Sequence, residues 1–412
     1  MSNVLGIISE YNPFHNGHLH HLNESKRITH SDYSIAIMSG NFTQRGETSI
    51  VDKWTKTKMA IENGIDLVIE LPTIYAISSA ENFADGAVKI LNSLGIVDFI
   101  SFGSECDDIS ILNDVANVLC SEPDEYRTLL SHELSKGNSF PKAREKALMM
   151  YLNDVRRFAN VLSSPNNILG IEYLKALKRQ KSKIEPVTVK REGSGYNDNV
   201  ISKSAKFASA SAIRNACLAK NFDVLQNVMP DASYELLINN IKRGNIVNNI
   251  SAFDKEIIYT LRKLSIDDIA NLPDVSEGLE FSLKNAANSC NSVIELLSMV
   301  DSKRYTKTRI QRILLYALLG ITKKDMQVSK NINPYIRILG FNDKGKGVLS
   351  EISKKNKKLE LVSSVKKFMD KGPNKNLKML MEKDIWASNV YTLGFEYESF
   401  ANLDYTEKLI TY

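Results

Sequence analysis

Two histidines at a glycine-containing turn are the residues in this chain best suited to chemistry. His15 and His18 flank Gly17 in a His-Asn-Gly-His turn that follows Asn12-Pro13. An imidazole can donate a hydrogen bond to a phosphoryl oxygen whose charge changes during transfer. Gly17 has no Cβ, so a ligand can come close to the backbone. The turn favours phosphate binding, with His15 and His18 as candidate catalytic residues.

The elements around this turn support an anion site. An apolar run at 4–9 predicts a strand, and a helical pattern over 17–29 follows the turn directly. A helix N-terminus offers free N–H groups and a partial positive charge to phosphate oxygens. Zinc is the alternative because His20 and His21 lie close by, but Glu10 is the only obvious further ligand. We therefore predict no resident metal ion.

A serine and an arginine one helical turn apart form a second candidate phosphate clamp. Ser209 or Ser211 would cap a helix that runs on through Ile213, and Arg214 would lie one turn into it. The helix N-terminus, Ser211 and Arg214 could together hold a phosphate group. The alternative is an ordinary capped helix at the surface.

Further polar clusters follow other predicted strands. The segment 39–47 suits a loop that presents side chains to a small anion, and we predict Ser39, Asn41 and Arg45 as substrate-binding residues. An ordinary surface loop is the alternative. A similar cluster surrounds Gly103, and Arg191 at the end of the last strand could reach phosphates or be merely solvated. Asn166 or its neighbour could read an adenine edge or a ribose, with a plain N-cap as the alternative.

The order of the predicted elements indicates an α/β fold with a Rossmann-like parallel sheet. Apolar strands are predicted at 4–9, 33–38, 66–71, 97–102 and 184–190, and helices between them at 17–29, 51–63, 77–94 and 166–180. Ligands in such sheets bind at the carboxyl ends of the strands, where the predicted site residues lie.

We predict a catalytic domain at 1–230, with a helical insertion near 105–165, and a mainly helical region at 231–412. The helices expected in the second region are 232–242, 253–263, 276–299 and 303–320, followed by a strand at 335–339 and a helix at 346–354.

Composition and charge narrow the class of protein. The 412 residues are 43% hydrophobic and 25% charged, as in an ordinary globular protein, and neither a signal peptide nor a membrane span is expected. Four scattered cysteines favour a reduced, cytoplasmic setting. Residues 1–230 carry a net charge of −1 and residues 231–412 one of +6. The second region could therefore hold a polyanion.

A basic helix start is the strongest candidate for that contact. Arg304, Lys307, Arg309 and Arg312 open an apolar helix, with basic pairs three residues apart on shared faces. We predict these four residues as RNA-binding, and a merely solvated helix start is the alternative.

With these motifs assembled, the chain resembles the bacterial tRNA(Met) cytidine acetate ligases, which are nucleotidyltransferases with a His-x-Gly-His turn. The resemblance rests on the segments 6–18, 39–47, 102–105, 165–173 and 209–214, and it continues at 304–309 and 318–321. It implies an enzyme that forms acetyl-adenylate from ATP and acetate. The acetyl group then passes to N4 of the wobble cytidine of elongator tRNA(Met).

The resemblance also implies site residues and partners. Arg214 with Ser211 would hold the departing pyrophosphate, Mg²⁺ would accompany the ATP phosphates, and no membrane or stable protein partner is implied. The implied ATP-binding residues are Ile7, Ile8, Ser9, Glu10, Tyr11, Asn12, Pro13, Phe14, His15, Asn16, Gly17, His18, Leu19, His20, Gly103, Asn166 and Arg191. The alternatives are a nucleotidyltransferase for a phosphorylated metabolite and a nucleotide-regulated RNA-binding protein.

Overall fold

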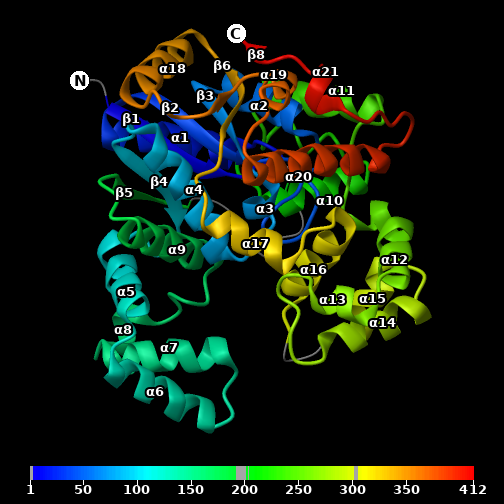
Figure 1. Ribbon diagram of the computed structural model, residues 1–412. Coiled ribbons are helices and arrows are strands. Elements are labelled where there is room, and N and C mark those ends of the chain that lie inside the picture. The colour runs from blue at the N-terminus through cyan, green and yellow to red at the C-terminus, as the bar shows by residue number, and fades with distance from the viewer. Residues whose placement is uncertain (1–2, 192–200, 203, 301–304) are drawn as a thin grey trace.

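One mixed sheet runs through the computed structural model, which describes residues 3–191, 201–202, 204–300 and 305–412 (Figure 1). Its strand order is β5-β4-β1-β2-β3-β6-β7, and β8 pairs with β6. The strands are β1 (Asn3–Ser9), β2 (Ser31–Ser39), β3 (Leu67–Leu71), β4 (Phe99–Ser104), β5 (Glu185–Lys190), β6 (Ile336–Phe341), β7 (Leu361–Val362) and β8 (Ile410–Thr411).

The first five strands are parallel, as the sequence predicts, and each lies within about two residues of its predicted range. Uninterrupted apolar runs produce them, and every residue of β3 is buried because helices cover both faces of the sheet. The predicted α/β fold with a parallel sheet is confirmed.

The helices of the first half also follow the predicted pattern. The predicted helix 77–94 begins later, at Ala80, because the side chain of Ser79 caps it by accepting the N–H of Asn82. The helices that surround the sheet are α1 (Asn16–Thr29), α2 (Lys53–Glu62), α3 (Thr73–Ala76), α4 (Ala80–Leu94), α9 (Pro165–Arg179) and α10 (Ala210–Leu218).

The predicted insertion is helical. Its members are α5 (Ile109–Ser121), α6 (Asp124–Ser135), α7 (Phe140–Tyr151) and α8 (Val155–Phe158). Figure 1 shows α6 and α7 standing away from the sheet, with α5 leading out to them.

Helices dominate the rest of the chain. They are α11 (Asp231–Lys242), η1 (Ile250–Phe253), α12 (Asp254–Lys263), α13 (Ile266–Ala270), α14 (Leu279–Ser289), α15 (Val293–Val300), α16 (Lys307–Leu319), α17 (Lys323–Lys330), α18 (Asp343–Lys355), α19 (Val365–Asp370), α20 (Lys375–Tyr391), η2 (Thr392–Gly394) and α21 (Leu403–Thr406). The single helix predicted at 276–299 is wrong, because extended backbone at Cys290 separates α14 from α15. Within the described residues, every helix is too short or too polar to cross a bilayer.

The sheet continues across the domain boundary predicted at residue 230. Strand β6 pairs antiparallel with β3, and β7 and β8 then pair with β6. The second region therefore builds one edge of the same sheet instead of standing apart from it. Its β8 packs closely, since a Cβ on Gly340 would lie 2.8 Å from Ile410.

Candidate active site

A cavity of about 540 Å³ opens at the carboxyl ends of β1, β4 and β5. It brings together most of the predicted site residues, although they lie far apart in the sequence. The predicted residues that line it are Ile7, Ile8, Ser9, Glu10, Tyr11, Asn12, His15, Gly17, His18, His20, Arg45, Gly103, Asn166, Arg191, Ser211 and Arg214.

Four residues of the predicted ATP-binding stretch, Pro13, Phe14, Asn16 and Leu19, do not line this cavity. Phe14 is fully buried and packs against Tyr11 with ring centroids 4.8 Å apart. The Asn16 amide donates to the carbonyls of Lys206 and Asn227 at 3.0 Å. Phe14 and Asn16 thus support the turn through contacts with other parts of the protein. The local sequence does not distinguish such supporting residues from residues that contact a ligand.

Hydrogen bonds fix how the two histidines are presented. His15 caps α1, where its Nδ1 accepts the Gly17 N–H at 3.0 Å. The His18 Nδ1 accepts the His15 backbone N–H at 3.2 Å, so each neutral ring carries its proton on Nε2. The centroids of the His15 and His18 rings lie 3.8 Å apart. A Cβ on Gly17 would come within 2.8 Å of the His15 ring, so this turn needs glycine to accommodate that ring.

Both histidines are neutral at physiological pH. Burial, with Arg191 and Arg214 nearby, lowers the pKa of His15 to about 3. Burial and the neighbouring His15 also hold the pKa of His18 well below its usual value. The site therefore offers two neutral N–H donors, and its positive charge comes from arginine.

The second predicted clamp reaches the same cavity. Ser209 is the cap of α10, since its side chain accepts the Ala212 N–H at 3.1 Å, and Ser211 lies beside it. The Arg214 guanidinium donates to the Asn12 carbonyl at 2.9 Å and to the Glu47 carboxylate at 3.1 Å.

Several residues that line the cavity were not predicted from the sequence. Glu47 brings a carboxylate into a cavity that arginines also line. Its presence there is explained by its ion pair with Arg214, a residue far along the chain. Thr308, at the start of α16, also lines the cavity and places the second half of the chain at its rim. The aromatic residues Phe83 and Tyr173 also line the cavity. In the sequence they look like ordinary core residues, so nothing there marks them as part of a site.

The structure distinguishes the two adjacent asparagines. Asn166 lines the cavity and donates to Glu105 at 2.6 Å. Asn167 is buried, and its side chain accepts the Glu105 N–H at 2.9 Å. Of the two, Asn166 is therefore placed to meet a ligand, together with Gly103 and Arg191 at the neighbouring strand ends.

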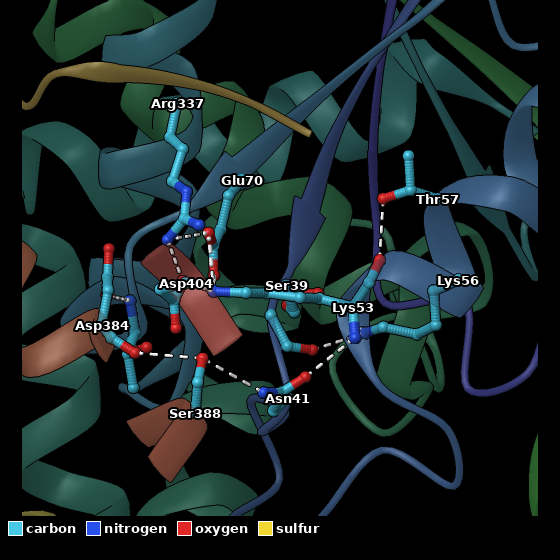
Figure 2. Close-up of polar contacts among 12 residues, drawn as sticks. Ser39, Asn41, Lys53, Lys56, Thr57, Glu70, Arg337, Asp384, Ser388 and Asp404 are labelled. Carbon is cyan, nitrogen blue, oxygen red and sulfur yellow. Dashed lines mark hydrogen bonds and ion pairs between the residues drawn. The ribbon is translucent and has the colours of Figure 1, made fainter. Parts of the chain in front are cut away.

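Two predicted substrate-binding residues lie elsewhere. Ser39 and Asn41 are buried and do not line the cavity, unlike Arg45 from the same segment. The Asn41 side chain accepts the Lys53 N–H at 2.8 Å and donates to Ser388 at 3.3 Å, contacts that Figure 2 shows. We therefore correct their role from substrate binding to support of the loop that carries Arg45.

Two of the four basic side chains predicted to bind RNA, Arg309 and Arg312, form contacts within the protein. Arg309 donates to the Asp274 carbonyl at 2.6 Å and to Ser276, and Arg312 pairs with the Asp274 carboxylate at 3.3 Å. Lys307 is exposed beside the cavity-lining Thr308. The predicted Arg304 lies outside the described residues.

Within the described residues, no group of three or more His, Cys, Asp or Glu side chains is arranged to hold a metal ion. The cavity's carboxylates have other partners, since Glu10 accepts the Gln44 N–H at 2.7 Å and Glu47 accepts from Arg214. The arrangement thus suits a polyphosphate held by donors: a helix N-terminus, two imidazole N–H groups and arginines.

Comparison with known proteins agrees with this geometry. The HIGH Nucleotidyl Transferase family matches residues 2–405. The tRNA(Met) cytidine acetate ligase of Thermoanaerobacter sp. is 47% identical over 407 residues, and that of Acetivibrio thermocellus is 45% identical over 415 residues. In both cases 99% of each chain is covered.

Solved structures show the same architecture. The crystal structure of Thermotoga maritima TmcAL bound with alpha-thio ATP is 35% identical, with a TM-score of 0.91 over 99% of each chain. The apo form I of that protein gives a TM-score of 0.94 at the same identity and coverage.

Proposed function

Because this chain belongs to the tRNA(Met) cytidine acetate ligase family of HIGH nucleotidyltransferases, we propose that it uses ATP to acetylate the wobble cytidine of elongator tRNA(Met). First, an acetate oxygen attacks the α-phosphorus, the bond to the β-phosphate breaks and pyrophosphate leaves. Second, the N4 amine of the cytidine attacks the acetyl carbonyl and AMP leaves. The amine loses a proton, and N4-acetylcytidine results.

The observation that carries this proposal is the pair of Nε2–H donors at the start of α1. His15 and His18 are held as neutral donors by their Nδ1 contacts, in a cavity that Arg191 and Arg214 also line. Donors fixed before the reaction stabilise charge that develops on the transferring phosphate. Ser211 and Arg214 at α10 would hold the pyrophosphate as it leaves.

Acetate, Mg²⁺ and the tRNA complete the proposal. Arg45 is the predicted residue of the 39–47 loop that lines the cavity and could meet the acid. Glu10 and Glu47 already accept protein hydrogen bonds, so Mg²⁺ would be held mainly by the phosphates of ATP. We propose that residues 1–230 carry the chemistry in the cytoplasm, while the basic region 231–412, with Lys307, meets the tRNA.

The test is nucleoside mass analysis of tRNA after incubation with the purified protein, ATP and isotopically labelled acetate. Labelled N4-acetylcytidine in elongator tRNA(Met) is the expected product. The matched control is the same tRNA with uridine at the wobble position, which should take up no label. Pyrophosphate release that requires another acid, with no labelled cytidine, would overturn the assigned substrate.

A further inference from the structure

Lys56 of α2 is a fully buried lysine, and among the residues that the structure describes its ammonium donates hydrogen bonds to uncharged acceptors only. Its Nζ donates to the backbone carbonyls of Glu10 at 2.9 Å, Ser39 at 2.7 Å and Gly40 at 2.6 Å. A further contact at 2.9 Å reaches the Ser49 hydroxyl. Burying a charge without a counter-ion is costly, so these hydrogen bonds must compensate for lost hydration.

The neighbouring buried lysine on the same helix differs. Lys53 pairs with Glu70 at 2.8 Å and with Asp404 at 2.7 Å, so its charge is neutralised within an ion cluster. Figure 2 shows the Lys53 side chain reaching Glu70 and Asp404, while the Lys56 side chain lies apart from that ion cluster. The direct hydrogen bonds of Lys56 instead go to three carbonyls and one hydroxyl, and these contacts define what its ammonium holds in place.

Those carbonyls lie at the carboxyl ends of β1 and β2, where the chain continues into two segments that line the cavity. Glu10 follows the end of β1 and lines the cavity, while Ser39 is the last residue of β2 and Gly40 leads from it into the loop that carries Arg45. A second link joins the same two segments, since the Glu10 carboxylate accepts the Gln44 N–H at 2.7 Å. The Lys56 ammonium thus joins the residue that follows β1 to the residues that lead into the Arg45 loop, and the contact between Glu10 and Gln44 adds to this link.

We propose that Lys56 is a positioning residue for ATP activation: its ammonium holds the ends of β1 and β2 at the spacing that lets both loops meet one nucleotide. Lys56 acts through backbone carbonyls and does not contact the substrate. This inference rests on the proposed function, because it assigns Lys56 to the geometry of the same reaction.

The ammonium form is required, and it titrates near neutrality. Burial lowers the pKa of Lys56 to about 7, although the carboxylates of Glu10, Glu70 and Asp52 oppose this shift and Lys53 adds to it. A neutral amine has one donor fewer for the four acceptors, so the activity should decline as pH rises through this range.

The first test replaces Lys56 by the nearly isosteric Met. Lys56→Met should lower kcat/KM for ATP about 100-fold in acetate-dependent pyrophosphate exchange, because a small misplacement of reacting groups has that effect. The matched control is Thr57→Val, the next residue, which is fully buried and loses one hydrogen bond to the Lys53 carbonyl without touching the cavity loops. The control should retain wild-type kinetics.

ATP affinity measured by equilibrium dialysis needs no acid substrate, so it reports on Lys56 even if the protein activates an acid other than acetate. A Lys56→Met variant that unfolds at the wild-type temperature, with wild-type ATP affinity and kcat/KM, would overturn the proposal. Weakened ATP binding in a folded variant would support it whatever the acid.

A second variant covers the case in which Lys56→Met does not fold. Ser49→Ala removes one acceptor of the ammonium, which should lower the pKa of Lys56 further and shift the alkaline decline of kcat/KM to lower pH. Coincident pH profiles for Ser49→Ala and the wild type would contradict a role of the ammonium.

Discussion

At the scale of single residues, His15 has two separable tasks. Its Nδ1 caps α1, and we propose that its Nε2–H donates to the transferring phosphate. Asparagine is a good N-cap whose oxygen can accept the Gly17 N–H, but it cannot supply a donor at the Nε2 position. His15→Asn should therefore lower kcat by about 10²–10³. Its unfolding free energy, measured in urea, should change by less than about 1 kcal/mol.

The matched control is His30→Asn at the other end of α1. His30 is exposed and has a left-handed backbone (φ 48°), which asparagine tolerates. It lies away from the cavity residues, so His30→Asn should keep the wild-type kcat. A wild-type kcat in His15→Asn would show that the imidazole does not take part in the reaction.

The predictability of a site residue depends on whether its partners are local. The placement of His15 and His18 follows from a turn and a helix start within a few residues, and the structure has both side chains at the cavity. Asn41 was misassigned because its side chain meets Ser388, which no local pattern reveals. Glu47 was missed for the same reason, since its partner Arg214 lies far along the chain.

At the scale of elements, α16 joins the basic region to the cavity. Lys307 is exposed at its first turn, where the helix dipole adds positive character. If this end meets a phosphate of the tRNA, Lys307→Ala should weaken tRNA binding. The slope of log K against log salt should fall by about one, measured by filter binding over a salt series.

The control for this prediction is Lys142→Ala on α7, an exposed lysine of the insertion that stands away from the sheet. Its salt slope should match that of the wild type. An unchanged slope in Lys307→Ala would mean that the start of α16 is merely solvated. Arg309→Ala is unsuitable as a probe of tRNA binding. The Arg309 guanidinium donates to the Asp274 carbonyl, and loss of that hydrogen bond would also affect folding.

Periodicity predicted most of the elements but could not place every break. Buried parallel strands are short apolar runs, so β1 to β5 stand out in the sequence. The break between α14 and α15 does not, because Cys290 and its neighbours carry no glycine or proline that would mark it. Pairing of β6 with β3 also escapes local patterns, since these strands are distant in sequence.

At the scale of the whole molecule, a buried ion cluster joins α21 and β6 of the second region to α2 and β3 of the first. Asp404 of α21 pairs with Lys53 at 2.7 Å and also with Arg337 of β6, and Glu70 of β3 pairs with both cations (Figure 2). This cluster fastens the edge formed by the second region onto the parallel sheet. The two regions should therefore unfold in one cooperative transition, despite their different net charges.

Asp404→Asn tests that dependence, because it keeps the shape of the side chain and removes one buried charge. Breaking a buried pair leaves an uncompensated cation, so the unfolding free energy at pH 7 should fall by about 3–5 kcal/mol in urea.

Burial disfavours the Asp404 carboxylate, but Arg337 and Lys53 hold its pKa at about 2, below the unfolded value of about 3.9. Its stabilisation is therefore complete above about pH 4 and is lost as pH falls through 2, a loss that Asp404→Asn should not show. Glu407→Gln removes an exposed carboxylate of the same segment and should behave as the wild type. If Asp404→Asn matched that control in urea, the cluster would contribute nothing to holding the two regions together.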